Sequence, residues 1–106
     1  MSWTAAESFC RGYGARLVEI DSSAENTVIE DEITKVGIQT WIGLTGATTE
    51  GVWKWASGRT PSYMNWASSQ PNGDGDCSRI YPDTDGWWDG SCSSSWLPLC
   101  QKKPLL

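Results

Sequence analysis

Residues 65–92 read NWASSQPNGDGDCSRIYPDTDGWWDGSC, and this stretch decides how the rest of the chain is interpreted. Its first half has neither helical nor strand periodicity, which indicates a loop. Side-chain oxygens recur along the stretch, at Asn65, Gln70, Asn72, Asp74, Asp76 and Asp89. Oxygen ligands beside a proline-containing turn are typical of a calcium site. The neighbouring tryptophans indicate a ligand with both apolar faces and hydroxyl groups, such as a sugar.

The composition predicts one domain and excludes several kinds of function. The 106 residues are enough for a single domain, residues 1–106, with a modest core. The net charge of -5 disfavours nucleic acid and anionic membranes as partners, and no apolar run is long enough for membrane insertion. The chain has no histidine, which removes histidine-based catalysis and histidine metal sites. No nucleophile–base pair is evident, so we expect a binding domain and not an enzyme.

The cysteines indicate the compartment. Their spacing fits no zinc site, and the set is Cys10, Cys77, Cys92 and Cys100. An even number of cysteines in a small domain predicts two disulfides, and hence a secreted, extracellular protein. Four cysteines allow three pairings. Of these, the nested pairing would tie the two ends of the chain together and close the hairpin that carries the long loop.

Two helices are predicted near the start of the chain. Thr4–Glu7 has the capping-box pattern, with Thr4 as the N-cap, Glu7 reaching back and Trp3 as a preceding apolar contact. The inner face of this helix would be Ala6, Phe9 and Cys10. Ser22–Glu25 is a second capping box. The helix that follows would end at Gly37, with an acidic outer face and an inner face formed by Val28, Ile29, Ile33 and Val36.

The remainder of the chain is rich in strand patterns. Strands are predicted at residues 17–20, 41–44, 52–55, 77–81, 87–89 and 97–102, with a long irregular segment at 56–76 and a turn at 82–86. A loop of that length in a small domain is usually functional. Because the helices come first and most strands follow, the predicted fold class is α+β: two helices, an antiparallel sheet and a long ligand-binding loop.

Taken in order, these segments resemble the C-type lectin-like domain family. The resemblance covers nearly the whole chain and is carried by SWTAAESFC, LVEIDSSAEN, WIGL, VWKW, NW, QPN, DC, WWD and the final LC. It implies the nested disulfides, Cys10–Cys100 and Cys77–Cys92, and a fold in which the long loop binds calcium and sugar. In the family a strand normally precedes the first helix and pairs with the last strand. That strand is absent or shortened here, so we expect a bare sheet edge.

The resemblance also implies a ligand set. In sugar-binding members, a Glu-Pro-Asn or Gln-Pro-Asp triplet and a later Trp-Asn-Asp triplet supply calcium ligands, which also hydrogen-bond two sugar hydroxyls. The middle proline of the first triplet is normally cis. This chain has Gln70-Pro71-Asn72 and Trp87-Trp88-Asp89 in those places. Gln70, Asn72 and Asp89 are therefore the implied ligands, and the alternative for the first triplet is an ordinary polar turn.

The chain departs from the family pattern at several positions. The acid expected two residues before Cys77 is Gly75, and Asp74 is the candidate to replace it, the alternative being a solvated turn acid. Trp88 replaces the asparagine ligand, either stacking on a sugar or covering a metal-free loop. An accessory calcium site keeps two acids, Glu50 and Asp76, but has glycine at two further positions, Gly46 and Gly73.

Together these residues predict weak calcium binding, near millimolar. They also predict broad, low-affinity recognition of bacterial or fungal cell-wall glycans by a secreted innate-immune pattern receptor, with avidity from multivalent display. The alternative is a calcium-independent lectin-like domain that binds a protein partner through the long loop.

Overall fold

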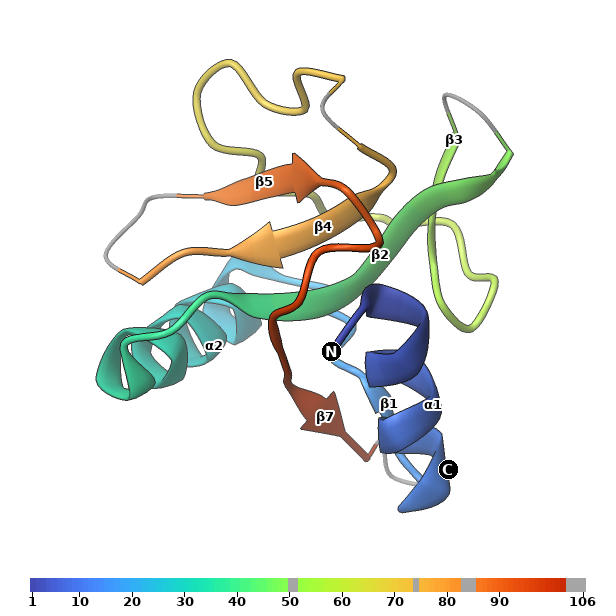
Figure 1. The fold of residues 1–106 in the computed structure, drawn as a ribbon. Coiled ribbons are helices and arrows are strands. Elements are labelled where there is room, and N and C mark those ends of the chain that lie inside the picture. Colours follow the sequence, from blue (N-terminus) through green and yellow to red (C-terminus); the bar gives the residue numbers. More distant parts are fainter. Residues whose placement is uncertain (50–51, 74, 83–85, 103–106) are drawn as a thin grey trace.

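The structure is a computed structural model that describes residues 1–49, 52–73, 75–82 and 86–102. Figure 1 shows two helices and a set of short strands, which confirms the predicted α+β class. The helices are α1 (Trp3–Gly12) and α2 (Ser23–Val36). The strands are β1 (Arg16–Leu17), β2 (Thr40–Thr49), β3 (Val52–Trp55), β4 (Cys77–Ile80), β5 (Trp87–Gly90), β6 (Leu97–Pro98) and β7 (Cys100–Gln101). No helix in the described ranges is long and apolar enough to cross a membrane.

The strands form two sheets. In the main sheet the antiparallel order is β3-β2-β4-β5, and β6 adds to β2 in parallel. The second sheet is the antiparallel pair β1–β7, which lies beside α1 at the opposite end of the molecule from the β4–β5 hairpin (Figure 1). Among the described residues β1 is the one strand that pairs with β7, so the bare edge expected on the other side of β7 stays a prediction. Met1 exchanges backbone hydrogen bonds with Trp96, at 3.0 Å in both directions.

Helix α1 begins two residues earlier than predicted. Its N-cap is Ser2, whose hydroxyl oxygen accepts a hydrogen bond from the Ala5 amide at 3.2 Å. Glu7 does not reach back to the cap, because its side chain turns into the protein and its Oε2 accepts from the Leu17 amide at 3.3 Å. Trp3 also fixes this end of the helix, since its indole donates to the carbonyl of Ile42 at 2.8 Å.

The inner face of α1 was predicted only in part. Ala6 and Cys10 are buried as expected, and Trp3 packs on the same core cluster. Phe9 is 44% exposed and packs against Tyr13 one turn later. The buried positions are thus one helical stripe, spaced by three and four residues, and Phe9 lies beside that stripe.

Helix α2 confirms the predicted N-cap and end. The hydroxyl of Ser22 accepts from the Glu25 amide at 3.2 Å, while Glu25 accepts from the Asp21 amide at 2.8 Å. Gly37 has a positive φ of 78°, as a terminating glycine requires.

The inner face of α2 differs from the prediction. Val28 and Val36 are 60% and 58% exposed, whereas Asn26 and Ile33 are buried. The asparagine takes an inner position because its Oδ1 accepts a hydrogen bond from the Trp87 indole at 2.8 Å. A buried indole N–H needs such a partner, so the polar residue belongs to the core here.

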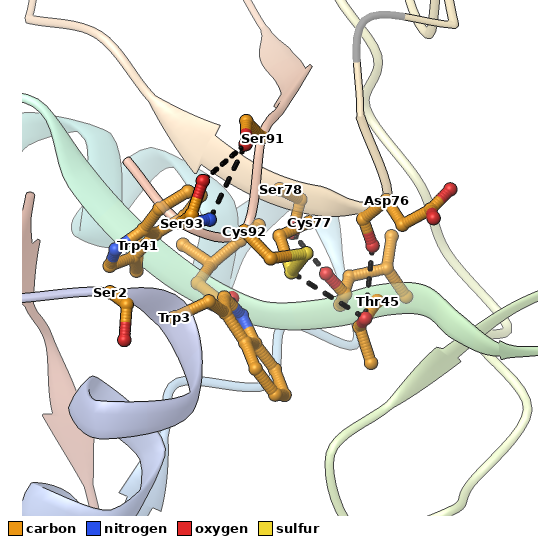
Figure 2. Close-up of a disulfide and its surroundings, with 12 residues drawn as sticks. Ser2, Trp3, Trp41, Thr45, Asp76, Cys77, Ser78, Ser91, Cys92 and Ser93 are labelled. Carbon is orange, nitrogen blue, oxygen red and sulfur yellow. Dashed lines mark hydrogen bonds between the residues drawn. A yellow bond between two sulfur atoms is a disulfide. The ribbon is translucent and has the colours of Figure 1, made fainter. Parts of the chain in front are cut away.

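The core consists of two clusters on either side of the sheet. The cluster next to α2 contains Val18, Ile20, Ile33, Ile42, Leu44, Trp55, Ile80 and Trp87. The cluster next to α1 contains Ala6, Cys10, Leu17, Trp41 and Cys77. Both disulfides of the nested pairing are present, Cys10–Cys100 and Cys77–Cys92, and the second lies against the α1 cluster beside Trp3 and Thr45 (Figure 2). The bridges close loops of very different length, separated by 90 and 15 residues.

Candidate functional site

The long segment between β3 and β4 is attached to the main sheet at its middle. Trp66 forms a parallel bridge with Trp87, in which the Trp87 amide donates to Asn65 at 2.8 Å and the Ala67 amide donates to Trp87 at 2.9 Å. The Trp66 ring packs edge to face on Trp53. Figure 1 shows the part of the loop that follows these contacts over the β4–β5 hairpin.

The loop then folds back onto β5. The Gln70–Pro71 peptide is cis, as the resemblance implies, and Ser69 before it has a positive φ of 66°. The Gln70 amide donates to the carbonyl of Ala67 at 3.0 Å. Two residues past the proline, the Gly73 amide donates to Oδ2 of Asp89 at 2.9 Å. The structure thus brings the end of the Gln70–Gly73 segment into contact with Asp89.

Asp89 is the best defined of the predicted ligands. It is 1% exposed and pairs with Ser78 across the β4–β5 ladder. Its Oδ2 is occupied by Gly73, but its Oδ1 is buried and accepts no hydrogen bond in the described part of the chain. Oε1 of Gln70 is also buried, and within the same described ranges it too accepts none.

Buried oxygens without donors are costly, by about 1–3 kcal/mol for a neutral acceptor and more for a charged one. A carboxylate oxygen and an amide oxygen are also the donor types that calcium prefers. Each of these two atoms is therefore of a donor type that fits calcium. The described residues hold no cluster of three or more carboxylate, thiol or imidazole side chains that could bind a metal.

The other predicted ligands are less informative. Asn72 is exposed beside the cis proline. Asp74 and Glu50 lie outside the described residues. Asp76 is exposed, and its carbonyl accepts from the Thr45 hydroxyl at 2.9 Å and the Gly46 amide at 2.7 Å (Figure 2). Asp76 therefore joins the end of the loop to β2 through its backbone.

Trp88 lies apart from these oxygens. Side chains alternate along a strand, so Trp88 and Asp89 point to opposite faces of β5. The indole of Trp88 packs edge to face on Tyr81 at 5.2 Å, opposite Arg79 in the ladder. The Arg79 guanidinium in turn stacks over Tyr81 at 4.8 Å and over Trp96 at 5.5 Å. Contact between Trp88 and a sugar stays a prediction.

Gly75 shows why the family's third acid is missing. A Cβ atom built at this position would overlap the carbonyl group of Gly90 at the end of β5. Gly90 is constrained as well, since a Cβ there would lie 2.9 Å from Nε of Arg79. The two backbones approach so closely that only glycine fits at Gly75 without a shift of the chain.

Asn26 and Tyr63 contact Trp87 and so support the strand that carries Asp89. Asn26 fixes Trp87, the residue two before Asp89, and this role was missed because an asparagine on an inner helix face carries no motif. A fully buried tryptophan in the neighbouring strand was the available signal, because its N–H must be paired. Tyr63 packs against the same indole, and burial, with a smaller contribution from Glu30, raises the pKa of its hydroxyl.

Known proteins share this arrangement. Residues 1–102 match the profile of the Lectin C-type domain family. C-type mannose receptor 2 of Mus musculus is 36% identical over 98% of this chain, and the chain spans 7% of that receptor's length. Among solved structures, the mouse scavenger receptor C-type lectin carbohydrate-recognition domain superposes with a TM-score of 0.86 and 32% identity, over 99% of this chain and 83% of that one. The cow CD23 C-type carbohydrate-recognition domain, solved with a GlcNAc2Man3 oligosaccharide, superposes with a TM-score of 0.78 and 28% identity, over 94% of this chain and 78% of that one. The chain therefore belongs to the C-type lectin domain family, whose members are non-enzymatic carbohydrate-binding domains.

Proposed function

We propose that this domain binds glycans at the long loop with the assistance of a weakly held calcium ion. The observation that carries the proposal is the pair of buried, unsatisfied oxygens, Oδ1 of Asp89 and Oε1 of Gln70. The hydrogen bond from Gly73 to Asp89 supports it, because it holds the two ligand-bearing segments together. The proposed ligand set is Gln70, Asn72, Asp74 and Asp89.

The calcium ion, when bound, would polarise sugar hydroxyls and complete the coordination of the buried oxygens. The protein supplies the remaining hydrogen bonds. Gln70 and Asn72 each offer an amide oxygen and an NH₂ group, so their order of donors and acceptors selects hydroxyl pairs less strictly than an acid–amide pair does. Calcium affinity rises with the number of charged ligands and the rigidity of the site. With Asp89 and at most Asp74 as carboxylates, we place the dissociation constant near that of extracellular modules, about millimolar.

The proposed ligands are cell-wall polysaccharides of bacteria or fungi. A related domain was solved in the presence of GlcNAc2Man3 oligosaccharide, which supports oligosaccharides as the ligand class. Weak and unselective single sites suit repetitive polymers, because multivalent display multiplies affinity by about 10² to 10⁴ without new contacts. The two disulfides suit an oxidising compartment, and secretion in innate immune recognition is part of the proposal.

One finding favours a second function. Because Gly75 cannot accept a side chain, the site has lost the family's third acid at that position. A domain without calcium could instead bind a protein through the same loop.

Binding to immobilised mannan, galactan and peptidoglycan separates the two functions. We expect binding in 10 mM calcium that is lost in EDTA and lost in Asp89→Asn. The matched control is Asp31→Asn, which removes an exposed carboxylate from α2 and leaves binding unchanged. Glycan binding that is equal with and without EDTA would reject the calcium-assisted mechanism, and no binding to any glycan would favour the protein-binding alternative.

A further inference from the structure

A second concave site lies at the end of the domain away from the long loop. A cavity of about 480 Å³ is enclosed by the C-terminal end of α1, the β1–β7 pair and the segment after β3. This volume is in the range of sites for small ligands, about 300–1,000 Å³. Figure 1 shows α1, β1 and β7 at the opposite side of the molecule from the β4–β5 hairpin and the loop above it. The cavity is thus separate from the proposed calcium site.

The cavity collects positive charge in an acidic chain. Four of the eight basic residues of the sequence line it: Arg11, Arg16, Arg59 and Lys102. One carboxylate, Glu19, also lines it. Since the chain as a whole carries a net charge of -5, this concentration of cations is local to the cavity.

The single carboxylate is already neutralised within the wall. Glu19 is buried and accepts from Arg59 at 2.8 Å and 3.1 Å, and from the Ser57 amide and hydroxyl, both at 3.1 Å. Arg59 also contacts Asp21 at 3.1 Å. The charge of Arg59 is therefore used by the protein, and this ion-pair cluster forms a rigid part of the cavity wall.

The other three cationic side chains of the cavity, Arg11, Arg16 and Lys102, are available to bind an anion. Arg11 and Lys102 are exposed and make no ion pair in the described ranges of the chain. Arg16 has only a loose contact, 3.8 Å from Oε1 of Glu7. Gln101 completes the rim, and its Oε1 accepts from the Glu19 amide at 3.4 Å, which directs the side chain over β1.

We propose that this cavity binds a short anionic saccharide, one or two sugar units that carry a sulfate or carboxylate group. Guanidinium groups pair with such oxyanions through two parallel hydrogen bonds. Among the described residues that line the cavity none is aromatic, so it has no stacking platform for a neutral sugar or a base. The acidic remainder of the surface repels long polyanions such as nucleic acid, which favours a compact anionic group at the end of a glycan.

The test is a titration in EDTA, so that the calcium site plays no part. The probes are a sulfated disaccharide, a glucuronate-containing disaccharide and the neutral disaccharide of the same backbone. Binding of each is measured by ¹⁵N NMR of the disulfide-bonded domain. We expect both anionic probes to shift the amide signals of Gly14 and Gln101, and the neutral probe to shift neither. Each lost charge-assisted hydrogen bond should weaken binding about tenfold.

The informative variants are Lys102→Gln and Arg11→Gln, and the matched control is Lys35→Gln on the exposed face of α2. The first two should weaken binding of the anionic probes and the control should not. Equal binding of the neutral probe, or equal loss in the control, would overturn the proposal. Tighter binding of a hexaglutamate peptide than of either saccharide would overturn the choice of a glycan. Asp89→Asn should leave these titrations unchanged, so failure here is distinct from failure at the long loop.

Discussion

Calcium should stabilise the folded domain through Asp89, and Asp89→Asn should remove that effect. In the folded protein Oδ1 of Asp89 and Oε1 of Gln70 are buried and accept no hydrogen bond from the described residues. The proposed ion would bind these oxygens in the folded state, whereas unfolding exposes them to water. The substitution keeps an oxygen for the Gly73 amide and removes the negative charge. The quantity to compare is the calcium-induced shift within each protein, because this shift is independent of any difference in stability without calcium.

The magnitude follows from linkage between binding and folding. For a dissociation constant of about 1 mM, a calcium concentration of about 10 mM adds about 1.4 kcal/mol to the free energy of unfolding. For a domain of this size that corresponds to a rise in Tm of about 6–10 °C. The assay is differential scanning calorimetry at neutral pH, with 10 mM magnesium as the control for ionic effects.

Three results are expected together. The unmodified domain shows the rise with calcium, Asp31→Asn shows the same rise, and Asp89→Asn shows none. A full calcium shift in Asp89→Asn would refute the assignment of this carboxylate as a ligand. A shift above about 20 °C, which on the same conversion corresponds to a dissociation constant of about 90 μM or tighter, would refute the inference of a weak site.

Three further outcomes follow from the fold. Replacing the Cys10–Cys100 pair by alanine should lower the free energy of unfolding by about 4.6 kcal/mol, and replacing Cys77–Cys92 should lower it by about 3.0 kcal/mol, from the chain entropy of the two loops. Urea denaturation should therefore show the larger loss for Cys10–Cys100, and the reverse order would contradict the loop-length argument. Gly75→Asp, which restores the family's acid, should lower the denaturation midpoint and leave calcium affinity unimproved, because any side chain there meets Gly90; a tighter calcium isotherm would show that the loop can move. Burial raises the pKa of Glu7 above its ordinary value of 4.5, so the folded state holds this proton more tightly, and the contribution of Glu7 to stability is greatest below the unfolded-state pKa and is lost as the pH rises through the folded-state pKa. Glu7→Gln should therefore gain stability relative to the unmodified domain between pH 4 and pH 7, and a difference independent of pH would contradict this.

The sequence was most informative where one residue type has one physical role. The cap of α2 and the terminating Gly37 were predicted from local rules, because a hydroxyl cap and a left-handed glycine act within one turn. Asp89 and Gln70 were predicted from the resemblance, and the structure adds that an oxygen of each is buried without a donor.

The errors share a different cause. The start of α1 was predicted at Thr4, whereas the observed cap is Ser2, and Trp3 after it bonds through its indole to a strand that follows much later in the chain. The inner face of α2 was predicted from apolar residues, yet Asn26 is buried there while Val28 and Val36 are exposed. The overlap of Gly75 with Gly90 likewise depends on how two distant backbones approach. In each case the deciding contact is tertiary, and local pattern does not encode it.

The indole of Trp87 connects helix α2 to the loop that carries the proposed ligands. Its ring nitrogen bonds to α2, its backbone bonds to loop residues on both its amide and carbonyl sides, and it stands two positions from the buried carboxylate. A substitution at Asn26, 61 positions away along the chain, would therefore alter the geometry of the loop that carries the proposed ligands, while changing none of them. Mutational screens for altered glycan preference should accordingly include the inward side of α2 as well as the loop itself.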